Sequence, residues 1–218
     1  PSTRGTACAP GEHELRIARG RRALMRVTAP RASQRRAVLL ALHGAGSGGA
    51  PGGLHAFRGA WDVPGLVIVA PAAAGTAWTL ESRDVAFVDR ALQRAFDRCP
   101  VLPRRVAVGG FSSGAGMALW LGLTNGDLFR SVIALSGGGS LPRERVGKPR
   151  VFLAHGTGDA VIPISPLIRA RSGSAISRAV NSAAISARHS WPRTLRNRCG
   201  QNICCAPPEA SMRNWKSR

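Results

Sequence analysis

Tyrosine is absent from this 218-residue sequence, and lysine occurs only at positions 148 and 216. Nearly all of the 31 cationic residues are therefore arginines, against 11 acidic residues, which gives a formal net charge of +20. A charge of this size is typical of proteins that bind nucleic acid or anionic lipid. A GC-rich coding sequence, however, favours arginine codons over lysine and tyrosine codons without any ligand. We therefore expect no nucleic-acid partner.

Two further absences limit the class of protein. No run of eighteen apolar residues occurs, which excludes a membrane-spanning helix. There is also no CxxC pair, and the number of cysteines, five, is odd. Neither a regular disulfide framework nor a zinc site is therefore indicated. The location stays open, with a cytoplasmic one favoured. The sequence begins at Pro1 rather than at a methionine, so it says nothing of a signal peptide.

Apolar runs alternate with amphipathic segments along most of the chain. Strands are predicted at 14–18, 23–28, 37–42, 66–70, 105–109, 131–136 and 150–154, the first two as an antiparallel pair at a sheet edge. Helices are predicted at 81–99 and 114–124. Because several strands are apolar throughout, they are expected to be buried on both faces. The pattern predicts an α/β fold, a mostly parallel sheet covered by helices on both faces.

The composition changes after about Ile164. Residues 1–164 carry 21 cations and 10 anions, whereas residues 165–218 carry 10 cations and the single anion Glu209. We interpret 1–164 as the folded core and 165–218 as a basic, Arg- and Ser-rich segment that is poorly ordered. The alternative is that the reading frame changes near Ile164. An uninterrupted frame in the gene would exclude this alternative.

The pentapeptide Gly110-Phe111-Ser112-Ser113-Gly114 has the form G-x-S-x-G. It lies between a predicted strand and a predicted helix, which is the setting of a nucleophile elbow. Glycines are needed there because a Cβ atom would clash in so tight a turn. Ser112 is therefore the candidate nucleophile, and the Ser113 N–H at the helix start is a candidate oxyanion donor. The alternative is a plain Gly-Ser turn.

The glycine-rich loop 43–49 follows a buried strand and has two interpretations. Gly44-x-Gly46-x-x-Gly49 satisfies the dinucleotide fingerprint, but the position of the ribose-binding acid is occupied by Val69. We also expect Ala50-Pro51-Gly52-Gly53 to prevent the helix that this fingerprint requires. As an oxyanion loop, the segment would place the Ala45 N–H beside that of Ser113. The second interpretation is favoured.

A nucleophilic serine needs a base and an acid that orients it. Asp159 follows a strand at the carboxyl edge of the sheet, where sites form, whereas Asp127 lies on a turn where capping explains it. His189 is the histidine that follows Asp159. Two earlier histidines, His43 and His155, are expected to brace loops. Trp78, after the fourth strand, either walls a substrate pocket or caps the core.

Three motifs, taken in order, resemble the phospholipase/carboxylesterase branch of the α/β-hydrolases over residues 10 to 164. They are Leu42-His43-Gly44-Ala45-Gly46, the stretch 108–114 around Ser112, and the stretch 155–163 around Asp159. The resemblance implies a triad of Ser112 as nucleophile, Asp159 as acid and His189 as base. It also implies a last strand and a final helix, for which residues 165–218 show no convincing pattern.

The resemblance implies a serine hydrolase that cleaves a small-molecule carboxylic ester or thioester without a metal or organic cofactor. The short stretch 137–148 leaves no room for a cap domain, so an open site is expected. Two alternatives remain: an inactive hydrolase-like scaffold with a degraded C-terminus, and a nicotinamide-dependent oxidoreductase that uses the Gly44 loop.

Overall fold

The computed structural model describes residues 8–162, except 19, 33, 139–140 and 157–158. Within these residues, a seven-stranded sheet has the order β1-β2-β4-β3-β5-β6-β7. The strands are β1 (Gly11–Ala18), β2 (Arg21–Val27), β3 (Arg36–Leu42), β4 (Leu66–Pro71), β5 (Val101–Phe111), β6 (Ser131–Leu135) and β7 (Arg150–Ala154). Strands β3 to β7 are parallel, while β2 pairs antiparallel with both β1 and β4. This confirms the predicted α/β class and the antiparallel pair at the edge.

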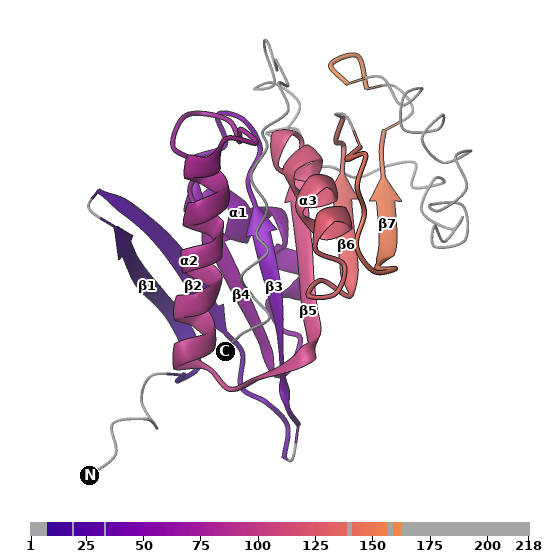
Figure 1. Ribbon diagram of the computed structural model, residues 1–218. Coiled ribbons are helices and arrows are strands. Elements are labelled where there is room, and N and C mark those ends of the chain that lie inside the picture. Colours follow the sequence, from indigo (N-terminus) through magenta and orange to yellow (C-terminus); the bar gives the residue numbers. More distant parts are fainter. Residues whose placement is uncertain (1–7, 19, 33, 139–140, 157–158, 163–218) are drawn as a thin grey trace.

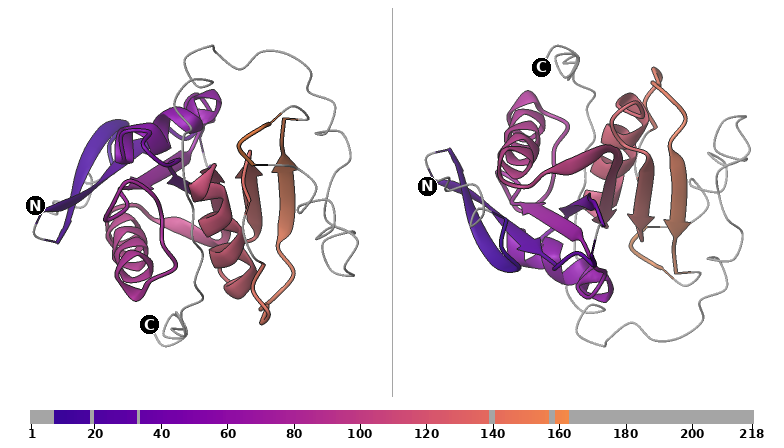
Figure 2. Two further views of the ribbon diagram at one scale, coloured as in Figure 1. Left: turned by 90° about the horizontal axis from the view of Figure 1, so that it is seen from above. Right: turned by 90° about the horizontal axis from the view of Figure 1, so that it is seen from below.

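Helices cover both faces of the sheet (Figures 1 and 2). They are α1 (Ala50–Ala56), α2 (Ser82–Arg98) and α3 (Ser113–Thr124), with a short 3-10 helix η2 (Arg58–Ala60) after α1. The helix α1 lies on one face, and α2 and α3 lie on the other (Figure 2). None of the helices in the described part of the chain is long and apolar enough to cross a membrane.

The central strand β3 shows why polar residues do not alternate with apolar ones in the predicted buried strands. Val38, Leu40 and Leu42 belong to the core cluster on the side of α2 and α3. Leu39 and Ala41 belong to the second cluster, with residues of α1. Because successive side chains of a strand point to opposite faces, a strand covered on both faces must be apolar at every position.

The helix α1 corrects the expectation that Ala50-Pro51-Gly52-Gly53 would prevent a helix. Pro51 occupies the first turn, where its missing N–H has no helical partner to lose. The two glycines allow the helix to approach its neighbours closely. A Cβ atom on Gly52 would collide with the Ser47 carbonyl oxygen, and one on Gly53 would lie 2.7 Å from the Ala41 carbonyl oxygen.

A disulfide joins Cys8 and Cys99, although the odd number of cysteines indicated no disulfide framework. The two residues are 91 positions apart in the sequence, and their Cα atoms lie 5.1 Å apart. The bond ties the segment before β1 to the end of α2. Spacing could not show this pairing, because the fold alone brings the two residues together.

The other predictions about the C-terminal part lie outside the described residues. They concern the segment 165–218, the last strand and helix, and the boundary at Ile164. They stay predictions.

Candidate active site

Ser112 occupies a strained turn between β5 and α3. Its backbone angles are φ 53° and ψ −117°, in a region that residues other than glycine rarely adopt. A Cβ atom on Gly110 would collide with the backbone of Gly114, and one on Gly114 would collide with the backbone of Leu42 and His43. The tight approach of α3 to β3 and β5 therefore requires both glycines. The Ser112 side chain is presented where the parallel strand ends.

The loop 43–49, which we call the His43 loop, lies directly against this turn. A Cβ atom built on Gly44 would be 3.3 Å from the Ser112 Cβ atom. Ala45 follows in the chain, and Ser113 is the first residue of α3, whose N–H belongs to the donors without an intrahelical partner. The structure thus brings Ser112, Ser113 and the His43 loop together. The roles of the Ala45 and Ser113 N–H groups as oxyanion donors stay predictions.

His43 braces its own loop, as its place in the sequence suggested. The Ala73 N–H donates to Nε2 over 2.9 Å, so Nδ1 carries the proton and donates to the Gly44 carbonyl oxygen over 2.8 Å. Burial lowers the pKa of His43, because a charged ring would lose its hydration. The ring is therefore neutral, with one nitrogen accepting and the other donating.

The lowered pKa of His43 predicts a loss of stability in mild acid. The unfolded chain protonates this ring near pH 6.5, whereas the folded chain protonates it only at lower pH. Below about pH 6.5 the unfolded state therefore binds more protons, and the free energy of unfolding falls as the pH falls. This one group contributes a decrease of up to about 1.4 kcal/mol between about pH 8 and pH 5.5.

Urea unfolding at these two pH values would measure the effect. The variant His43→Gln should show a smaller decrease than the unaltered chain, because it has no ring to protonate. A His55→Gln control removes an exposed histidine and should keep the full decrease. Equal decreases for the unaltered chain and the His43→Gln variant would contradict the prediction.

Asp159 lies in the loop after β7, at the same edge of the sheet as Ser112 but two strands away. Its Oδ1 atom accepts from the N–H groups of Val161 and Ile162, each over 3.0 Å. His155 Nε2 lies 3.4 Å from its Oδ2 atom and donates to the Ile162 carbonyl oxygen over 2.6 Å. His155 thus braces this loop, as expected. The role of Asp159 as the acid stays a prediction, and His189 lies outside the described residues.

Trp78 contacts the His43 loop from the loop 72–80, which we call the Trp78 loop. Its indole N–H donates to the His43 carbonyl oxygen over 3.0 Å, and the two ring centroids are 5.0 Å apart. The side chain is only 6% exposed and belongs to the main core cluster. Its hydrogen bond and burial are those of a residue that supports the His43 loop. A wall of the substrate pocket, the other role considered, stays a prediction.

Asp84 and Arg21 are the residues that sequence reasoning missed. In the helical period of residues 81–99, Asp84 lies between the apolar positions, but the structure buries it to 1% exposure. Its Oδ1 atom is 2.9 Å from Arg21 Nη2. An aspartate in the first turn of a helix is ordinary in sequence. No signal in the sequence shows that Arg21, at the start of the antiparallel strand β2, lies beside Asp84.

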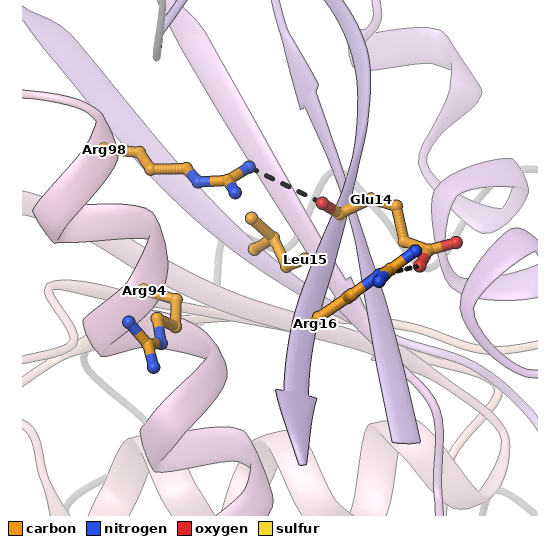
Figure 3. Close-up of a pocket in the computed structure, with 5 residues that line it drawn as sticks. All are labelled: Glu14, Leu15, Arg16, Arg94 and Arg98. Carbon is orange, nitrogen blue, oxygen red and sulfur yellow. Dashed lines mark hydrogen bonds and ion pairs between the residues drawn. The ribbon is translucent and has the colours of Figure 1, made fainter. Parts of the chain in front are cut away.

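A cavity beside the edge strand β1 is not lined by any of these residues. It lies between β1 and the last turns of α2 and is lined by Glu14, Leu15, Arg16, Arg94 and Arg98 (Figure 3). Glu14 pairs there with Arg16 and, outside the lining, with Arg22. None of the candidate site residues borders it. In the described part of the chain, no group of three or more His, Cys, Asp or Glu side chains is arranged to hold a metal ion.

The fold is shared with solved esterase structures of low sequence identity. A thermostable esterase has a TM-score of 0.59 and 19% identity, and the match covers 72% of this chain and 49% of that one. The S-formylglutathione hydrolase FrmB from Staphylococcus aureus has a TM-score of 0.61 and 12% identity. That match covers 79% of this chain and 89% of FrmB. An acetyl xylan esterase from Aspergillus awamori has a TM-score of 0.58 and 16% identity, and the match covers 72% of this chain and 76% of the esterase. The chain thus spans about half the length of the first of these proteins.

The chain has the α/β-hydrolase fold, with a strained turn at Ser112 between β5 and α3. Residues 82–185 match the model of the phospholipase/carboxylesterase family, and this match supports a hydrolase. The matched segment includes α2, the elbow at Ser112 and the loop of Asp159. No curated protein matches the sequence. The family match favours the hydrolase over the oxidoreductase that the Gly44 loop left open.

Proposed function

We propose that this chain cleaves small-molecule carboxylic esters or thioesters through an acyl-enzyme intermediate on Ser112. The observation that carries the proposal is the positive φ of Ser112 at the junction of β5 and α3. Strain of this kind costs about 1–3 kcal/mol and persists at functional sites. Its place against the His43 loop adds support, because an acyl-transfer site needs backbone N–H donors beside the nucleophile.

The proposed reaction has two halves. Ser112 Oγ attacks the carbonyl carbon while His189 accepts its proton and Asp159 orients the imidazole. The N–H groups of Ala45 and Ser113 stabilise the negative carbonyl oxygen of the tetrahedral intermediate. The intermediate expels the alcohol or thiol, which takes the proton from His189. Water then attacks the acyl-enzyme by the same route and releases the acid.

The relatives suggest which ester classes to test. One is named for an acetylated polysaccharide and another for S-formylglutathione, which is a thioester. The stretch 137–148 between β6 and β7 is too short for a cap domain. We therefore propose an open site that accepts small acyl groups on oxygen or sulfur, with no metal or organic cofactor in the reaction.

A fluorophosphonate probe followed by peptide mass spectrometry tests the proposal. The probe should label Ser112 in the folded full-length chain, and Ser112→Ala should abolish labelling. The variant His189→Ala should lower the labelling rate by about 10³-fold or more if this histidine is the base. An unchanged rate would reject His189. No labelling of the unaltered folded chain would indicate an inactive scaffold.

The Cys8–Cys99 bond supports an oxidising compartment rather than the cytoplasmic location favoured from the sequence. Structural disulfides persist outside the cytosol, where thiols are not continually reduced. Both cysteines are buried within the described core, at 8% and 0% exposure. Burial is typical of a structural link rather than of a reactive thiol pair.

A further inference from the structure

Two loops at the carboxyl edge of the sheet are joined by three hydrogen bonds. Ala73 N–H donates to His43 Nε2 over 2.9 Å, and the Trp78 indole donates to the His43 carbonyl oxygen over 3.0 Å. In the opposite direction, Gly46 N–H donates to the Thr76 carbonyl oxygen over 2.9 Å. These bonds lie on both sides of Ala45. The position of the Ala45 N–H therefore depends on the position of the Trp78 loop.

The Trp78 loop is in turn held by one buried carboxylate at the start of α2. Asp84 Oδ1 accepts from Ala74 N–H over 3.0 Å, near the start of the loop. Asp84 Oδ2 accepts from both the N–H and the hydroxyl of Thr79, each over 3.2 Å, near its end. A single side chain therefore fixes both ends of the loop. Figure 1 shows this loop arching from β4 to the first turn of α2.

Arg21 of β2 completes the arrangement. Its Nη2 atom donates to Asp84 Oδ1 and to the Ala72 carbonyl oxygen, both over 2.9 Å. Its guanidinium lies 3.7 Å from the centroid of the Phe87 ring. The charge of the buried carboxylate is thus compensated, which a stable buried position requires. Arg21 also adds a direct bond to the first residue of the loop.

We propose that Asp84, paired with Arg21, is a positioning residue for the oxyanion donor at Ala45. The inference rests on the proposed esterase function. Without the carboxylate, the N–H groups of Ala74 and Thr79 lose their acceptor and Arg21 loses its counter-charge, so the Trp78 loop shifts toward solvent. The His43 loop moves with it through its three bonds. A displacement of about 1 Å at a catalytic group can lower the rate about 10²-fold.

Kinetics of p-nitrophenyl acetate hydrolysis by the full chain test the catalytic consequence. Asp84→Ala should lower kcat about 10- to 100-fold with little change in KM, because an oxyanion donor acts in the transition state. Asp84→Asn, which keeps one carbonyl acceptor, should recover part of the loss. Asp97→Asn makes the same chemical change at an exposed position of the same helix and should leave kcat unchanged. Equal kcat values for Asp84→Ala and the unaltered chain would overturn the proposal.

Amide hydrogen exchange and the Trp78 indole N–H resonance give a readout that does not depend on turnover. Trp78→Phe assigns this resonance among those of the five tryptophans. In Asp84→Asn, exchange should rise at Gly46 as well as at Ala73, and the indole resonance should shift, while the strands keep their protection. Faster exchange confined to residues 72–80 would overturn the proposal. If the unaltered chain shows no turnover, the esterase function fails, and the exchange at Gly46 still decides whether Asp84 holds the His43 loop.

Discussion

Replacing Ser112 by glycine should abolish ester hydrolysis and, at the same time, make the protein more stable. Loss of the proposed nucleophile removes the proposed acyl-enzyme route and should lower kcat by about 10⁴-fold or more. The gain in stability has a separate cause. Ser112 has φ 53° and ψ −117°, and glycine adopts such angles without a steric penalty. The relief of about 1–3 kcal/mol exceeds the cost of glycine in the unfolded chain, which is up to about 1 kcal/mol.

Urea unfolding and esterase assays on the same samples test this prediction. Ser112→Ala is the matched control, because it removes the hydroxyl but keeps a Cβ atom at the positive φ. It should lose activity to the same extent without gaining stability. A Ser112→Gly variant that is less stable than Ser112→Ala would contradict the strain argument. Hydrolysis that survives both substitutions would contradict the assignment of the nucleophile.

Removal of the Cys8–Cys99 bond should lower the free energy of unfolding by about 4–5 kcal/mol. The bond closes a loop with a sequence separation of 91, and a cross-link of that length removes much conformational entropy from the unfolded chain. A loss of this size is a large fraction of the total stability of a typical domain, about 5–15 kcal/mol. The double variant Cys8→Ala/Cys99→Ala should therefore unfold at a much lower urea concentration.

Dithiothreitol provides the control for this variant. Reduction of the unaltered chain should cause the same loss as the double substitution, while the reductant should change the double variant little. Equal urea midpoints for the double variant and the oxidised unaltered chain would contradict the prediction. A production host that oxidises thiols should also yield more folded protein than a reducing one, if the chain functions in an oxidising compartment.

The strands and the strained turn at Ser112 were predictable because they depend on local patterns. Continuous apolar runs predicted β3 and β4, and the apolar period predicted α2, to within two residues at each end. The elbow was predictable because G-x-S-x-G between a strand and a helix is the setting in which such a tight turn forms. The prediction for α1 was wrong, because Pro51 was treated as a residue that breaks a helix rather than one that begins it.

The disulfide, the buried Asp84 and the hydrogen bonds of Trp78 were not predictable from the sequence. Each depends on residues that are far apart in the chain, such as Arg21 and Asp84 or Cys8 and Cys99. No local pattern records which strand will lie beside which helix. By its place in the helical period, Asp84 resembles a surface residue. Only the packing of β2 beside α2 buries it and pairs it with Arg21.

The sequence by itself determined the class of fold and the residue on which the proposed chemistry depends. Both follow from short-range rules, the alternation of apolar and polar positions and the steric demand of a tight turn. The scarcity of lysine and the absence of tyrosine also indicate that a GC-rich coding sequence explains much of the arginine content behind the +20 charge. Only the tertiary structure decided how the loops around Ser112 are held. The Asp84–Arg21 pair and the bonds between the two loops form when strands and helices distant in the sequence pack side by side.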